Sequence, residues 1–108
     1  MAQDFRRYTA NGVGTSPVTV VTANSNDTLI GISVANVAST QVTATVVIND
    51  GTNDITIVSS APIPVGSSLQ VLDGGAKQVM QSGDILKVTC SVTAGLDVWV
   101  SAVDAISA

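Results

Sequence analysis

The chain alternates short runs of hydrophobic residues with clusters of turn residues along its whole length. Within most runs every second residue is apolar, which is the period of a β-strand with one buried face. The clearest run is 41–49, and the residues on its predicted inward face are Val42, Ala44, Val46 and Ile48. The pattern therefore predicts strands rather than helices.

Nine runs fit this strand pattern. They cover residues 5–10, 18–22, 29–36, 41–49, 54–60, 68–72, 77–81, 85–92 and 96–103. Alternation also assigns faces within them. The predicted inward residues include Ile30, Ile32 and Val34 in 29–36, Ile55 and Ile57 in 54–60, and Leu96, Val98, Val100 and Ala102 in 96–103. No segment has the helical period.

Turn residues separate these runs. Asp50-Gly51 and Asp73-Gly74-Gly75 predict tight hairpins, because Asp-Gly pairs readily supply the positive φ that such turns require. Residues 11–17 predict a loop. Residues 61–66 contain two prolines, which remove ladder donors, so this stretch cannot be a central strand and is expected to cross between two sheets.

Short strands at this spacing indicate an all-β fold. We expect an antiparallel β-sandwich of eight to nine strands, jelly-roll or immunoglobulin-like, with its two sheets about 10 Å apart. A length of 108 residues fits one domain. Residues 1–10 are interpreted as an N-terminal arm or an edge strand, residues 11–108 as a single β-sandwich domain, and 104–108 as a frayed tail.

The amino-acid composition indicates what the core and the surface consist of. Aromatic residues make up only 3% of the chain against 45% hydrophobic residues in total, so the core must consist of small aliphatic side chains. The chain contains no Glu, its net charge is −4, and charged residues make up 11%. Such a weakly charged surface is typical either of an assembly that covers it or of a stable extracellular module. The few basic residues argue against nucleic acid as a partner.

Candidate catalytic chemistry is sparse. The chain has no His, the commonest general base and metal ligand, and its single cysteine, Cys90, is expected to be a small buried hydrophobe. The oxygen-rich loop 49–54 lacks the bidentate Glu of an EF-hand calcium loop. We therefore predict no enzyme, no cofactor and no metal site. No apolar run is long enough to span a membrane or to form a secretory leader, so we expect synthesis and folding in a cytoplasm.

Five residues are candidate partner contacts. Trp99 falls among polar neighbours on the face opposite the inward set of its strand, and tryptophan is enriched at interface hot spots. The alternative is a Trp that covers a sheet edge or lies under a loop. The other four candidates are Phe5, Arg6, Arg7 and Tyr8, whose basic and aromatic mixture fits a docking arm or an edge strand with its arginines in water.

The stretches 30–36, 61–69, 81–88 and 96–101 carry turn and strand signatures such as Ile63-Pro64-Val65-Gly66 and Ser82-Gly83-Asp84. In these stretches the chain resembles the small β-rich virion proteins of tailed phages, especially marine and cyanobacterial ones (cyanophages). The resemblance covers most of the chain. It implies a structural component of a bacteriophage virion, folded in the host cytoplasm, and it brings no catalytic residues.

From this resemblance we expect a capsid decoration (cement) protein that binds the major capsid protein in many symmetric copies or as a homo-oligomer. The alternative is a tail, neck or fibre-base module that binds tail or neck proteins. A third interpretation, a carbohydrate-binding module on a virion or cell surface, predicts several exposed aromatic residues in a row, for which only Trp99 and Tyr8 are available. Neither nucleic acid nor a membrane is expected as a partner.

Overall fold

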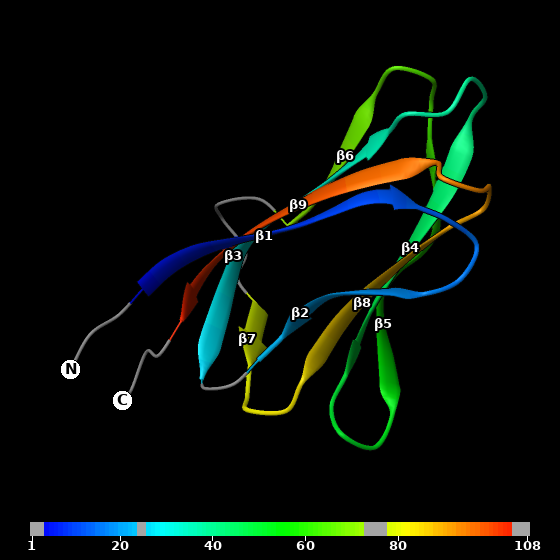
Figure 1. The fold of residues 1–108 in the computed structure, drawn as a ribbon. Helices are drawn as coiled ribbons and strands as arrows, with labels where there is room; N and C mark the ends of the chain where they lie inside the picture. The colour runs from blue at the N-terminus through cyan, green and yellow to red at the C-terminus, as the bar shows by residue number, and fades with distance from the viewer. Residues whose placement is uncertain (1–3, 24–25, 73–77, 105–108) are drawn as a thin grey trace.

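The computed structural model describes residues 4–23, 26–72 and 78–104, and shows two sheets that face each other (Figure 1). The described chain is all β, with nine strands. They are β1 (Asp4–Val13), β2 (Val18–Thr22), β3 (Asp27–Asn36), β4 (Val42–Asn49), β5 (Asp54–Ile63), β6 (Ser68–Leu72), β7 (Gln78–Met80), β8 (Ile85–Cys90) and β9 (Leu96–Asp104). The predicted fold class, an antiparallel β-sandwich, is confirmed.

The pairing of the strands identifies the sandwich as a jelly roll. One sheet has the order β1-β9-β3-β6, with β7 also on β3, and the other has the order β2-β8-β4-β5. The pairs β4–β5, β3–β6, β2–β8 and β1–β9 nest inside one another, as in a long hairpin folded over itself. An immunoglobulin-like sandwich keeps its first two strands in one sheet, whereas β1 and β2 lie in different sheets here.

The core lies between the sheets and consists of aliphatic side chains. The predicted inward residues of β4 and β9 are all buried, and so is Cys90. No aromatic side chain of the described residues belongs to the buried core. Small branched side chains that alternate along each strand thus fill the space between the layers, as the composition predicts.

A bulge in β3 makes one predicted inward position wrong. Leu29 pairs with Ala102, but the next pair joins Gly31 to Ser101, so Ile30 is an extra residue on its strand. The extra residue shifts the alternation by one position. Leu29 is therefore fully buried together with Ile32, whereas Ile30 is only partly buried.

In β5 the face predicted for Ile55 is correct, but this residue is less buried than predicted. Ile55 pairs with the inward Ile48, yet it is 49% exposed. β6 follows β5 after the short turn 64–67 and is half as long, so it opposes only the second half of β5. Ile57 is the extra residue of a bulge and packs against the core while partly exposed.

The proline segment is strand for longer than expected. Residues 61–63 continue β5 and pair with β4, so the prediction of a crossover there is wrong; only residues 64–67 cross to the other sheet. Pro62 is tolerated because β5 is an edge strand, which has no neighbour on its second side. The segment is not a central strand, as predicted.

The predicted loop 11–17 is also shorter in the structure. β1 continues to Val13 through a bulge at Asn11 and Gly12, where Gly12 has a φ of 64°. Glycine suits such a bulge because it lacks the Cβ that disfavours positive φ. The predicted Asp73-Gly74-Gly75 hairpin lies outside the described residues. Of the predicted frayed tail 104–108 only Asp104 is described, and there the prediction is wrong, because Asp104 is the last residue of β9 and pairs with Asp4.

Asn36, the last residue of β3, connects the loop that follows it to the end of β5. It is 6% exposed, and its Nδ2 donates to the carbonyl oxygens of Thr40 and Ile63, each at 2.9 Å. Its Oδ1 accepts the backbone N–H of Ala38 at 2.8 Å. One buried amide thus satisfies three backbone groups.

Replacing Asn36 by alanine is therefore expected to lower the free energy of unfolding by about 2–4 kcal/mol, because the buried backbone groups lose their partners. Urea unfolding of the variant measures the change. Asn11→Ala is the matched control: it removes an exposed amide that makes one 3.3 Å hydrogen bond to Asp97. Equal losses in the two variants would contradict the role assigned to Asn36.

Candidate functional site

The outer face of the β1-β9-β3-β6 sheet carries the most exposed large hydrophobic side chains of the described chain. Residues paired directly across antiparallel strands share one face of a sheet. At one end of this face, a row of pairs runs from Phe5 through Val103 and Thr28 to Val79. Phe5 is 80% exposed and Val79 is 69% exposed. Three of the four side chains in this row are hydrophobic, and the two at its ends are exposed to water.

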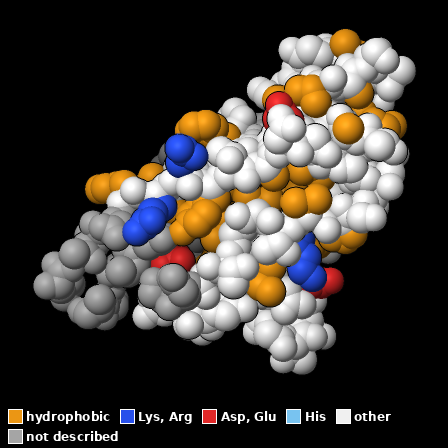
Figure 2. Space-filling model, viewed as in Figure 1, with side chains coloured by type: hydrophobic (Ala, Val, Ile, Leu, Met, Phe, Trp, Pro, Cys, Tyr) orange, Lys and Arg blue, Asp and Glu red, His pale blue; other side chains and the backbone are white. Residues whose placement is uncertain are grey.

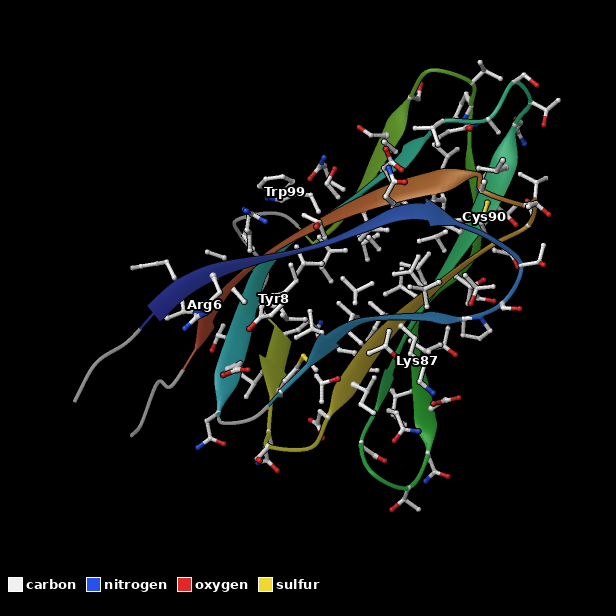
Figure 3. All side chains as sticks on the ribbon, viewed as in Figure 1. Arg6, Tyr8, Lys87, Cys90 and Trp99 are labelled. Atoms are coloured by element: carbon white, nitrogen blue, oxygen red, sulfur yellow. The ribbon has the colours of Figure 1, made fainter. Side chains whose placement is uncertain are left out.

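Trp99 lies in the middle of the same face. It pairs with Thr9 of β1 on one side and with Ser33 of β3 on the other, and it is 53% exposed. Its strand neighbours on this face are Asp97 and Ser101. The predicted position of Trp99, opposite the inward residues of its strand, agrees with the structure, and the indole stands on the sheet surface (Figure 3).

Arg7 stacks on Trp99. The guanidinium carbon lies 5.6 Å from the centroid of the indole ring. A cation–π contact at an exposed site is worth about 0.5–1 kcal/mol, enough to favour one orientation of the arginine. Stacking occupies the plane of the guanidinium but not its N–H donors, so these donors remain able to bind a carboxylate. We call Phe5, Arg7, Val79, Trp99 and Val103 together the Trp99 face.

The structure separates the five candidate residues by face. Phe5, Arg7 and Trp99 share the Trp99 face. Arg6 and Tyr8 pair with the inward Ala102 and Val100, so they lie on the other side of β1, as Figure 3 shows. Tyr8 is partly buried against the core. The segment is thus a strand that presents different residues to its two sides.

Val79 and Val103 were missing from the candidates taken from the sequence. Each belongs to a run predicted as a strand, but nothing local marks its outward face as part of a larger surface. They join Phe5 only because β7 and β9 both pair with β3 through Thr28. This long-range register cannot be read from the alternation of single strands.

The outer face of the other sheet differs in chemistry. Threonine is the commonest residue on this face, and its lysine has an acidic partner: the Lys87 Nζ lies 3.6 Å from Asp54 Oδ1. Figure 2 shows this basic side chain beside an acidic one, whereas the two basic side chains near the start of β1 lie next to hydrophobic ones. The two most exposed large hydrophobic side chains of the described chain, Phe5 and Val79, and two of its basic residues therefore belong to the sheet that contains β1.

The loop between β4 and β5 is a self-contained hairpin. Asp50 Oδ1 accepts the backbone N–H groups of Thr52 and Asn53 at 3.0 and 2.8 Å, and Asn49 Oδ1 accepts that of Gly51. These oxygens serve the turn itself, as expected of Asx residues. Among the described residues, no three acidic or cysteine side chains gather in a way that could hold a metal ion.

The same hydrogen bonds, first from Asn53 and then from Thr52, lower the pKa of Asp50 below its ordinary 3.8. The folded pKa is depressed, so the stabilisation of the turn is complete above pH 3.8 and is lost as the pH falls through the lower folded value. The amide resonances of Thr52 and Asn53 are therefore expected to titrate with a midpoint below pH 3.8. NMR titration measures this, with Asp50→Asn as the non-titrating control. A midpoint above 3.8 would contradict the assignment.

Comparisons with protein families, with curated proteins and with solved structures found no match to this chain. Within the described residues, no helix has the length and apolar character needed to cross a bilayer. Function is therefore inferred from the geometry of the surface and from the resemblance described above.

Proposed function

We propose that this chain is a structural protein of a bacteriophage virion, a capsid decoration protein that binds the outer surface of the capsid through its Trp99 face. The observation that carries the proposal is the presence of exposed Phe5, Val79 and Trp99 on one face of one sheet. Large aromatic side chains held on a rigid sheet are typical anchors of protein interfaces. The resemblance to small virion proteins supplies the partner, the major capsid protein.

Two further features support a role in a repeating assembly. The chain carries few charges, which suits a surface that is covered once the particle has formed. A sandwich is also a rigid platform: the Trp99 face is held by four strands in one sheet, not by a loop. Rigid presentation lowers the entropy cost of each contact.

The proposed mechanism is avidity. Each copy bridges neighbouring capsid subunits through a modest patch, and the symmetric lattice repeats the contact many times. Individually weak contacts can then hold the shell together against the pressure of packaged DNA. No residue of this chain undergoes chemistry in the process.

The test is binding of the purified chain to capsids assembled from the major capsid protein of the same genome. Co-sedimentation is expected to saturate at a fixed ratio of chain to capsid subunit, and decorated capsids are expected to withstand higher temperature. Absence of saturable binding would overturn the proposal. Binding to purified tails or necks instead would favour the alternative tail module, as would a gene that lies among tail genes rather than beside the capsid gene.

A further inference from the structure

The edges of the two sheets differ in how well they are protected from pairing with other chains. Natural sheets shield their edges with bulges, prolines, short strands or charges. Among the described strands, the edges are β1, β2, β5 and the β6–β7 side of β3. Three of these four are interrupted, and the fourth is β1.

The interruptions are specific. β2 is five residues long and carries an extra residue at Val20. β5 has two register shifts, a positive φ at Ser60 and a proline at Pro62. The third edge is divided between β6 and the three-residue β7, and β6 has a register shift of its own. None of the three offers a long regular ladder to a further strand.

β1 offers such a ladder. Residues 4–10 form seven consecutive pairs with β9, free of bulges and prolines, and no described strand pairs with their other side. Each residue of a strand directs its backbone N–H and C=O toward one edge, and the edge alternates along the chain. A strand of this length therefore presents several backbone donors and acceptors to an added strand.

The free side of β1 also adjoins partly exposed apolar surface. β1 and β2 lie in different sheets, and hydrophobic side chains are visible between them in Figure 2. Four apolar residues of these two strands pack on the core while partly exposed: Tyr8, Ala10, Val18 and Val20. A strand added to β1 would direct every second side chain toward these residues, so burial of apolar surface would accompany the new ladder.

The charge of β1 indicates which kind of segment could pair with it. β1 carries Arg6 and Arg7, two of the four basic residues of the chain. In the symmetric pairing with a second copy that uses all of residues 4–10, the two Arg7 side chains stand directly opposite each other, and opposed like charges destabilise a strand pair. An arginine on the inner side of an edge, such as Arg6, likewise disfavours a purely apolar strand. Both positions favour carboxylates across the ladder.

We propose that β1 is a strand-acceptor edge for an extended acidic segment of a different protein, with carboxylates opposite Arg6 and Arg7 and apolar residues opposite Phe5 and Tyr8. The inference deepens the proposed function, because the segment would belong to the capsid partner. It adds a second mode of contact, through the backbone, to the side-chain anchors of the Trp99 face. Its specificity comes from charge and its affinity from the ladder.

The probe is a capped heptapeptide, Val-Thr-Val-Asp-Glu-Val-Thr, which in antiparallel register sets Asp opposite Arg7 and Glu opposite Arg6. NMR titration of the full chain is expected to show saturable shifts at the backbone amides of residues 4–10. A peptide with Lys-Lys in place of Asp-Glu is expected to bind about tenfold more weakly, because two exposed charge pairs are lost. The acidic peptide with alternate amides N-methylated is expected not to bind.

A variant of the chain with one charge of β1 reversed tests the same preference from the other side of the ladder. Arg7→Glu is expected to remove most of the preference, because each peptide then meets one opposite charge and one like charge at residues 6 and 7. Lys87→Glu changes the net charge equally but lies on the other sheet, and it is expected to leave the preference for the acidic peptide in place. Absence of saturable binding, shifts confined to another edge, or equal binding of both peptides to the parent chain would overturn the inference, as would a dimer formed through β1 at the titration concentrations.

The titration contains no capsid, so it separates the two proposals. Failure of the peptide to bind would leave docking through the Trp99 face intact. Failure of the chain to bind capsids, with the peptide bound at β1, would leave the acceptor edge intact and remove its proposed source.

Discussion

Deletion of residues 1–10 is expected to lower the melting temperature by about 15 °C or more, or to prevent folding. It removes the seven regular pairs of β1 with β9 and exposes the buried Val98 and Val100 at a new edge. Losing several net hydrogen bonds and the packing of Tyr8 costs roughly 3 kcal/mol or more. In a domain of this size, each kcal/mol corresponds to roughly 4–8 °C.

Differential scanning calorimetry measures this effect. The matched control is the double substitution of Arg6 and Arg7 by alanine in the full-length chain, which keeps the backbone ladder and is expected to shift the midpoint by only a few degrees. A truncated chain with an unchanged midpoint would show that residues 1–10 are an arm in solution. The account of the acceptor edge would then fail as well, because it depends on β1 being part of the sheet.

Replacement of Trp99 by alanine is expected to weaken capsid binding at each site by about 30-fold or more, which corresponds to the 2 kcal/mol typical of a hot spot. The fold is expected to survive because the indole is 53% exposed and the buried residues of β9 are unchanged. Binding curves on capsids measure the loss, and circular dichroism checks the fold.

Val65→Ala is the matched control for this variant. Val65 is similarly exposed, at 55%, but it lies in the turn between β5 and β6, away from the Trp99 face. Its replacement is expected to leave capsid binding unchanged. If Trp99→Ala binds like the parent chain, the Trp99 face is not the docking surface. If Trp99→Ala loses the circular dichroism signal of β-structure, Trp99 is a structural residue instead.

Much of this fold follows from local rules. The alternation in 41–49 predicts β4 and its buried face, and the Asp50-Gly51 signal predicts the hairpin that follows, because both depend on residues close in sequence. The scarcity of aromatic residues predicts an aliphatic core. The strand pattern also places Trp99 on the outer face correctly, since it needs only the period of β9.

The errors share a cause, which is that single strands do not reveal their neighbours. Ile30 looks inward by alternation, but the pairing of β3 with β9 makes it the extra residue of a bulge. Pro62 argues against a strand in general, yet it is compatible with the edge position of β5. Ile55 has the correct face but lacks a strand to cover it. Burial, bulges and edges depend on the whole topology.

The same limit applies to the candidate site. Local sequence identifies Phe5, Arg7 and Trp99 as notable residues, but their convergence requires β1 and β9 to be adjacent, which links the two ends of the chain. The addition of Val79 requires a further pairing through β3. The jelly-roll order creates this surface by bringing the first strand beside the last, and no local period encodes that order.

We propose that the jelly roll docks on a capsid through the outer face of the β1-β9-β3-β6 sheet. Cryo-electron microscopy of particles that carry the chain tests it most directly. We expect density for the sandwich at symmetric positions on the outer shell, with Trp99 toward the capsid and the β2-β8-β4-β5 sheet toward solvent. Density confined to the tail, or a sandwich attached through the β2-β8-β4-β5 sheet, would contradict the account.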